Sequence, residues 1–352
     1  MVLGRWDGRI HSTETPWEQE IHGGGRECLG AILTDSKSSD RRKHPQRFGI
    51  SAFISAVLAL VVVAPLALLP ASWACRFAGL WVTPAWWLAR RRRQVTLSNL
   101  RHVYGKVWSD SRIRKMARES WRRVALSAVE ALQIRRWLSN PHFHQNIDWV
   151  GPWDELERRH QAGEPFLLVS GHLGPFEVVL PILVHRGWRV DLLSRHIKNG
   201  YVHRAMNALR SGTVPGIIDP SGALPEMGKS LRSGRCLAML VDQNTRDGLH
   251  IPFLGREAGT VPVVGVLQRR YRVPVVYLYA RRIEEGCRYR MVCEIADLPE
   301  GDDLRQHIDE VTCAVSARIE HWIRENPADW LWMHQRWKHR ADGSREELLA
   351  EG

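Results

Sequence analysis

The sequence lacks the cysteine patterns that indicate disulfide scaffolds or zinc sites. Its 352 residues include six cysteines, no two of which form a C-x-x-C pair. The remaining spacings fit no common zinc motif either. We therefore predict small buried or idle thiols, a reducing compartment and no metal centre.

Signatures of nucleic-acid binding are also missing, although the formal net charge of +12 favours acidic partners. Such partners include nucleic acid, anionic lipid and phosphorylated substrates. No zinc finger, RNP motif or helix-turn-helix pattern occurs. A nucleic-acid protein would also leave the long uncharged run beside the basic stretch unexplained, so we expect no nucleic-acid partner.

Charge is absent from residues 50–74, which follow a polar extension at 1–46. The extension shows no periodicity and no signal-peptide pattern, and we predict that it is disordered. The uncharged run is long enough to span a bilayer as a helix, although Pro65 and Pro70 would kink or break it. A shorter apolar stretch at 77–89 predicts an interfacial helix. We therefore assign residues 47–93 to a membrane anchor.

Four consecutive arginines, residues 90–93, follow the apolar stretches and begin a basic region. Basic residues beside a hydrophobic span indicate the cytoplasmic side and attract anionic lipid. The alternative is a solvated basic helix face. We expect attachment to the inner, cytoplasmic membrane, with the catalytic domain facing the cytoplasm and membrane lipid as a partner.

The rest of the chain alternates short apolar runs with amphipathic stretches, which is typical of an α/β fold. The clearest helix runs from Leu304 to Ile323 and stops before Pro327. We predict a mixed central sheet flanked by helices, forming one domain over residues 94–342 with a short tail at 343–352. The expected strands are 165–170, 190–194, 214–218, 236–241, 273–280 and 288–295. The other expected helices are 110–137, 201–209 and 224–231.

The sharpest local motif is Gly171-His172, followed five positions after the histidine by Glu177. An apolar run precedes it, so the imidazole would lie at the end of a strand, where sites form in α/β proteins. Histidine titrates near neutrality and can take a proton from a hydroxyl, and a nearby carboxylate can orient it. On its own this spacing is common, and a structural histidine fits it equally well.

Two further motifs give this pair a context. Asp242-Gln243-Asn244 ends another apolar run and is followed by residues 251–255, read IPFLG, and by Gly259-Thr260. The alternative interpretation of Asp242-Gln243-Asn244 is a capped turn between a strand and a loop. The second is the stretch 330–338, read WLWMHQRWK.

In this order, the motifs resemble those of the lipid A biosynthesis lauroyl/myristoyl acyltransferase family, within the lysophospholipid acyltransferase superfamily. The resemblance covers roughly residues 50–340 and implies a glycerolipid acyltransferase-like fold. It also implies that His172 is the general base and that Glu177 orients it. The acceptor oxygen would attack a thioester directly, without an acyl-enzyme, since no G-x-S-x-G elbow is present. No metal or other cofactor is implied.

The resemblance further suggests residues that contact substrates. Asp242, Gln243, Asn244 and Thr260 match motif positions near the family's active site. Phosphate favours arginine, and the best candidates are Arg195 and Arg210, although a plain surface role fits either one. One departure concerns residues 219–221, where family members often carry a basic residue and this chain has Asp-Pro-Ser. It weakens the case for phosphate contacts at that point.

An apolar pocket is expected to select acyl length, because each buried methylene contributes about 0.8 kcal/mol. Its predicted wall is Phe176, Val179, Leu180 and Ile182, for which ordinary core packing is the alternative. The donor could be acyl carrier protein or acyl-CoA. The glycolipid acceptor is expected to be a lipid A precursor, and the alternatives are a phosphatidylinositol mannoside, a lysophospholipid or an aminolipid. A noncatalytic membrane protein with a decayed site is a further alternative, which the intact His172 and Glu177 disfavour.

Overall fold

A computed structural model of the protein describes most of the chain from residue 68 onward. The described residues are 68–194, 199–211, 213–214, 216–220, 224–284, 288–299 and 303–346, together with 49, 53, 57, 301 and 348. The predicted extension at 1–46, most of the predicted anchor at 50–74 and Arg195 lie outside them. Within the described part of the chain, no helix is both long and apolar enough to cross a membrane.

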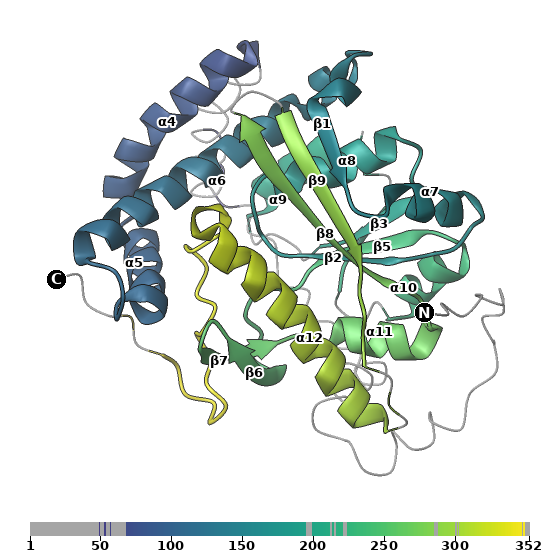
Figure 1. The fold of residues 1–352 in the computed structure, drawn as a ribbon. Coiled ribbons are helices and arrows are strands. Elements are labelled where there is room, and N and C mark those ends of the chain that lie inside the picture. The colour runs from purple at the N-terminus through teal and green to yellow at the C-terminus, as the bar shows by residue number, and fades with distance from the viewer. Residues whose placement is uncertain are drawn as a thin grey trace.

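A seven-stranded mixed sheet forms the centre of the domain, as the sequence predicts (Figure 1). The strand order is β1-β9-β8-β2-β5-β3-β4. All neighbouring pairs are parallel except β8 and β9, which form an antiparallel pair. The strands are β1 (Ile147–Val150), β2 (Leu167–Ser170), β3 (Val190–Leu193), β4 (Gly216–Ile218), β5 (Cys236–Leu240), β8 (Val275–Glu284) and β9 (Arg288–Ile295).

The sequence did not predict three of the observed strands. Besides β1, these are β6 (Leu249–Phe253) and β7 (Arg256–Thr260), which form a separate antiparallel hairpin. Each has only four or five residues, and β6 contains Pro252, which disfavours a strand assignment. The six strands that the sequence does predict are confirmed, with small differences at their ends.

The helices surround this sheet. They are α4 (Ala71–Leu88), α5 (Arg90–Tyr104), α6 (Asp110–Leu138), α7 (Trp153–Gln161), α8 (Phe176–His185), α9 (Gly200–Ser211), α10 (Leu224–Arg232), α11 (Val263–Tyr271) and α12 (Leu304–Glu325). Short 3-10 helices lie at Phe143–Asn146 and Pro327–Asp329. Most of the predicted interfacial helix at 77–89 falls within α4, which lies alongside α6 (Figure 1).

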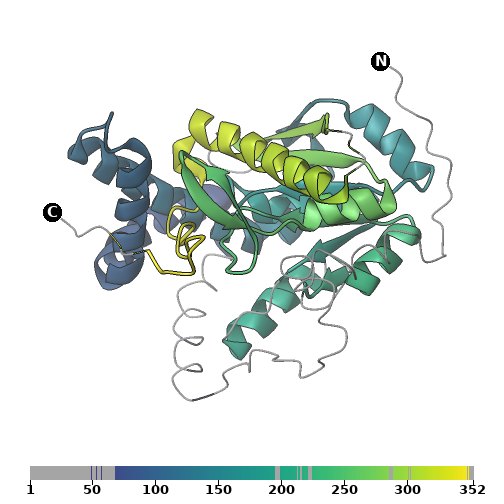
Figure 2. The ribbon, with the colours of Figure 1, turned by 90° about the horizontal axis from the view of Figure 1, so that it is seen from below.

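Two hydrophobic cores form because strand side chains alternate between the two faces of the sheet. In β2, Leu167 and Val169 belong to the core that also contains Ile319 of α12. Leu168, between them, belongs to the core that contains Val178 of α8. Figure 2 shows α11 and α12 together along one side of the sheet. The central strands are thus buried on both faces, and their carboxyl ends carry the candidate site.

Candidate active site

The ends of two adjacent strands bring the predicted histidine to a carboxylate. β2 and β5 are parallel neighbours, and their last residues, Ser170 and Leu240, are partners in the register. His172 and Asp242 each lie two positions beyond these residues. They therefore emerge side by side, and His172 Nδ1 lies 2.7 Å from Asp242 Oδ1.

Asp242 is deeply buried, with only 2% of its side chain exposed. Its Oδ2 accepts hydrogen bonds from the backbone N–H of His172 and from the Trp330 indole N–H, both at 2.8 Å. Gly171 makes this approach possible, because a Cβ at that position would lie 3.1 Å from Asp242 Oδ2. The carboxylate is thus held by one side chain and by the backbone of the loop that carries the histidine.

Asp242 also determines the chemical state of the imidazole. A carboxylate accepts only, so the network assigns the proton of neutral His172 to Nδ1 and leaves a lone pair on Nε2. The side-chain amide nitrogen of Gln243 lies 3.0 Å from that Nε2 and donates to it. Burial alone would lower the pKa of His172, but the Asp242 carboxylate outweighs burial and raises the pKa above its ordinary value. Burial likewise opposes ionisation of Asp242, yet contact with His172 and Trp330 lowers its pKa.

Glu177 does not occupy the place predicted for it. The carboxylate on the imidazole ring is Asp242, whereas Glu177 pairs with Arg210 at 2.7 Å. Glu177 lies in the first turn of α8, and Arg210 lies in the last turn of α9, where it also donates to Ser194 Oγ at 3.1 Å. The residue that packs against the imidazole from α8 is Phe176, with ring centroids 5.1 Å apart. Glu177 was expected to orient His172, but the carboxylate that contacts the imidazole is that of Asp242.

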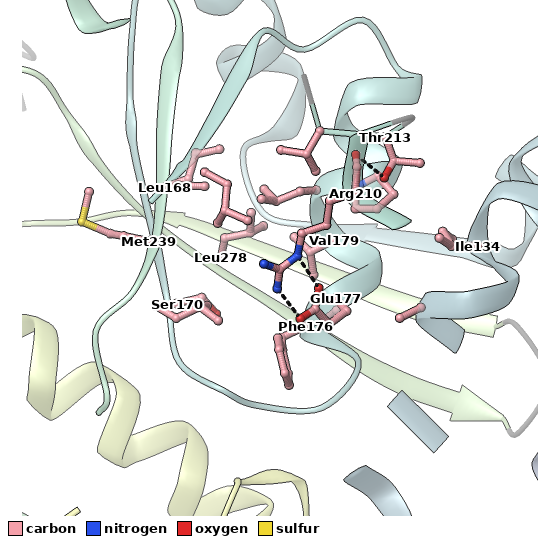
Figure 3. A pocket seen from close by; sticks show the side chains of 18 of the residues that line it. Ile134, Leu168, Ser170, Phe176, Glu177, Val179, Arg210, Thr213, Met239 and Leu278 are labelled. Carbon is pink, nitrogen blue, oxygen red and sulfur yellow. Dashed lines mark hydrogen bonds and ion pairs between the residues drawn. The ribbon is translucent and has the colours of Figure 1, made fainter. Parts of the chain in front are cut away.

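A largely apolar cavity lies on the α8 face of the sheet (Figure 3), and its lining includes Phe176, which packs against the imidazole. Its free volume is about 60 Å³, and about 760 Å³ when space open to solvent is included. Three of the predicted wall residues, Phe176, Val179 and Leu180, line it, and Glu177 and Arg210 point toward each other across one side. Ile182 does not line the cavity. It is 1% exposed and packs in the core beneath α8, which is the alternative considered for it.

Most of the other residues predicted to contact substrate form hydrogen bonds within the protein instead. Thr260 is 1% exposed and its hydroxyl donates to the carbonyl oxygen of Ala258. Asn244 donates from Nδ2 to the carbonyl oxygen of Arg336, and its Oδ1 is bonded to His339 Nδ1. Asn244 and the buried Asp242 lie in the loop after β5, whereas Thr260 ends β7, and the side chains of all three have partners within the protein. Of the predicted set, Asp242 and Gln243 contact the imidazole.

The structure assigns roles to residues 330–337, which the sequence marked as a motif without giving it a function. Arg336 is fully buried and donates to the carbonyl oxygen of Gly259 at 2.6 Å and to Thr260 Oγ1 at 2.5 Å. Burial lowers the pKa of Arg336 to about 10. His334 Nε2 accepts from the backbone N–H of Asn244, and burial lowers the pKa of His334 to about 4. This segment therefore supports the loop that carries Asp242 and Gln243.

The described residues contain no group of three or more His, Cys, Asp or Glu side chains that could hold a metal ion. In a comparison with family models, the model described as bacterial lipid A biosynthesis acyltransferase matches residues 36–339. This stretch includes the His172–Asp242 pair, the cavity and the supporting segment 330–337. No curated protein sequence matches the chain significantly.

Proposed function

Because the chain belongs to the bacterial lipid A biosynthesis acyltransferase family, it is an acyltransferase, and we propose that its acceptor is a hydroxyl of a lipid A precursor. The proposed donor is a fatty acyl thioester. The observation that carries the proposal is the His172–Asp242 pair at 2.7 Å, whose imidazole packs against Phe176 in the wall of a mainly apolar cavity.

His172 is the proposed general base. Its Nε2 takes the proton from the acceptor hydroxyl as the oxygen attacks the thioester carbonyl carbon. The resulting tetrahedral oxyanion collapses, the carbon–sulfur bond breaks, and the leaving thiolate takes the proton back from the imidazolium. The products are an ester and a free thiol, so His172 is regenerated and no acyl-enzyme forms.

Asp242 is the proposed partner of this base. It fixes the tautomer through Nδ1 and stabilises the imidazolium that forms when Nε2 is protonated. Gln243 occupies Nε2 in the structure. The acceptor hydroxyl therefore has to displace the Gln243 amide before it can donate its proton.

The cavity is the proposed site for the acyl chain. Val179 and Leu180 supply apolar wall, and the Glu177–Arg210 pair lines one side of the cavity. Arg210 already has a carboxylate partner, so we propose that it shapes this side of the cavity rather than binding phosphate. Arg195 remains a proposed phosphate contact. Acyl carrier protein and acyl-CoA both remain possible donors.

We also propose that α4 rests on the inner face of the cytoplasmic membrane. Its exposed side chains include Trp73, Leu80 and Trp87, and the arginines at 90–93 follow directly. Apolar rings beside cationic residues suit the interface of an anionic bilayer. Replacing these three residues by Gln should abolish cosedimentation with anionic phospholipid vesicles. Replacing Val150, an exposed apolar residue on β1, by Gln should not.

The enzymatic proposal is tested with the full chain purified in detergent. Lauroyl and myristoyl thioesters of acyl carrier protein and of coenzyme A are offered with a lipid A precursor, and products are analysed by mass spectrometry. We expect one acyl group to be added by the wild type and none by His172→Ala. A lysophospholipid, a phosphatidylinositol mannoside and an aminolipid are tested in parallel. Transfer to one of these alone would overturn the acceptor assignment, and equal transfer by His172→Ala would overturn the mechanism.

A further inference from the structure

The indole of Trp330 contacts the proposed catalytic carboxylate directly. Its Nε1–H donates to Asp242 Oδ2 at 2.8 Å, while Oδ1 accepts from the imidazole at 2.7 Å. Oδ1 therefore contacts the imidazole, whereas Oδ2 is held by the indole and by the backbone N–H of His172. Because Trp330 holds one oxygen, the carboxylate cannot rotate about its last bond without losing a charge-assisted hydrogen bond.

The backbone of Trp330 is joined to the loop that carries the base. Trp330 forms an antiparallel bridge with Leu173, and the next N–H, that of Leu331, donates to the carbonyl oxygen of His172 at 3.2 Å. On the other side, Ser120 of α6 donates to the carbonyl oxygen of Trp330 at 2.9 Å. Trp330 thus contacts Asp242 through its side chain, and its neighbour Leu331 contacts the backbone of His172.

Packing leaves the Trp330 ring little freedom. It is 1% exposed and lies against three other rings, those of Trp332, Phe253 and Trp337, with centroid distances of 4.7, 5.6 and 6.1 Å. Movement of the indole would require these neighbours to repack, which a close-packed interior resists. The N–H is therefore presented to Asp242 from a fixed point.

We propose that Trp330 is a positioning residue for acyl transfer, which holds the Asp242 carboxylate in line with His172 Nδ1. This inference rests on the proposed function, because it assumes that His172 and Asp242 act as base and partner. The indole of Trp330 thereby has a function besides packing in the core, namely to orient the Asp242 carboxylate. A tryptophan kept only for packing could present its N–H to any acceptor, as Trp332 does to the carbonyl oxygen of Pro327.

Trp153 provides a matched control. It is buried, and its indole N–H donates to the carbonyl oxygens of Val150 and Met291, far from the pair. We expect Trp330→Phe to lower kcat by about 10- to 100-fold with little change in KM, because a hydrogen bond to a charged group is lost. Trp153→Phe should lower thermal stability comparably and leave kcat per folded molecule within about twofold of the wild type.

The pH profile separates positioning from packing. The reaction needs neutral His172, so kcat/KM should fall as the pH falls through its pKa. Without the indole N–H, the Asp242 carboxylate keeps more negative charge, stabilises the imidazolium more strongly and raises the pKa of His172. The acidic limb of the Trp330→Phe profile should therefore move to higher pH. In Asp242→Asn the limb should move to lower pH, and in Trp153→Phe it should not move. The charged and titratable described groups that act on the pair are Glu177, Arg210, His334 and Arg336.

Two comparisons decide the outcome. In the Asp242→Asn background, Trp330→Phe should have little further effect on kcat, because the charge that the indole holds is gone. If Trp330→Phe is poorly folded, β-(3-benzothienyl)alanine at position 330 keeps the ring shape and removes only the N–H. Wild-type kcat and an unchanged acidic limb in that variant would overturn the inference. A normal rate in Asp242→Asn would instead overturn the proposed mechanism, so the two failures are distinguishable.

Discussion

Two acid–base pairs lie close to the cavity, and they have the same separation but different surroundings. His172–Asp242 and Glu177–Arg210 are each 2.7 Å apart. Asp242 is 2% exposed and accepts two further hydrogen bonds, whereas Glu177 is 19% exposed and accepts hydrogen bonds from Arg210. Because Asp242 is buried and held by further hydrogen-bond donors, the first pair is suited to fix the tautomer and charge of an imidazole. The second pair is partly exposed and is suited to hold α8 against α9.

The largest effect is expected at the base. His172→Ala should lower turnover by about two to four orders of magnitude, since general-base catalysis supplies roughly that much. Turnover per folded molecule and melting temperature are measured on the same samples. The control is His321→Ala, a histidine on α12 that is 54% exposed. A histidine kept only for packing would show the reverse pattern, with lower stability and an unchanged rate.

The sharpest test of the comparison exchanges each carboxylate for its amide. Asp242→Asn should lower kcat by about a thousandfold or more, because the imidazolium loses its charge partner and the tautomer is no longer fixed. Glu177→Gln should lower kcat by about tenfold to a hundredfold, because the partly buried Arg210 loses its charged partner. The effect is smaller because His172 keeps its contact with Asp242. The acidic limb of the kcat/KM profile should move strongly only in Asp242→Asn. Equal losses in the two variants would remove the distinction between the pairs.

A smaller effect is expected at the cavity wall. Val179→Leu adds one methylene to the wall and should reduce the preference for the longest accepted acyl chain by about fourfold, the equivalent of about 0.8 kcal/mol. Ile182→Leu is the control, because Ile182 packs in the core without lining the cavity. The product profile with a mixture of acyl thioesters is the measurement. A shift for Ile182→Leu and none for Val179→Leu would contradict the placement of the chain.

Sequence reasoning located His172 but not the carboxylate that contacts it, and the reason is physical. An apolar run ending in Gly171-His172 predicts a strand and a residue at its carboxyl end, and both are confirmed. Asp242 is 70 positions away from His172, and their contact depends on β2 and β5 being neighbours. Strand order is a property of the folded sheet and is not contained in local spacing. Glu177 was favoured because it is near in the chain, although the first turn of α8 directs it to Arg210.

The same reasoning explains the other differences. Asn244 and Thr260 were grouped with substrate contacts because their motifs stand beside a catalytic pattern. Both instead contact Arg336, which is 92 positions from Asn244 and 76 positions from Thr260. Phe176, Val179 and Leu180 line a cavity, whereas Ile182 of the same helix packs in the core. An apolar helix carries no sequence signal of which side faces a cavity.

The position of each pair in the sheet has a consequence for how the protein opens on heating. His172 and Asp242 follow β2 and β5, and β2 has three strands on either side of it. Arg210 belongs to α9, where none of the described side chains is buried. Elements with little buried surface open at a lower free energy than central strands, in separate cooperative units. Amide hydrogens of α9 should therefore exchange well before those of β2 and β5. A warmed enzyme should then lose its discrimination between acyl chains while its proton-transfer residues are still in place.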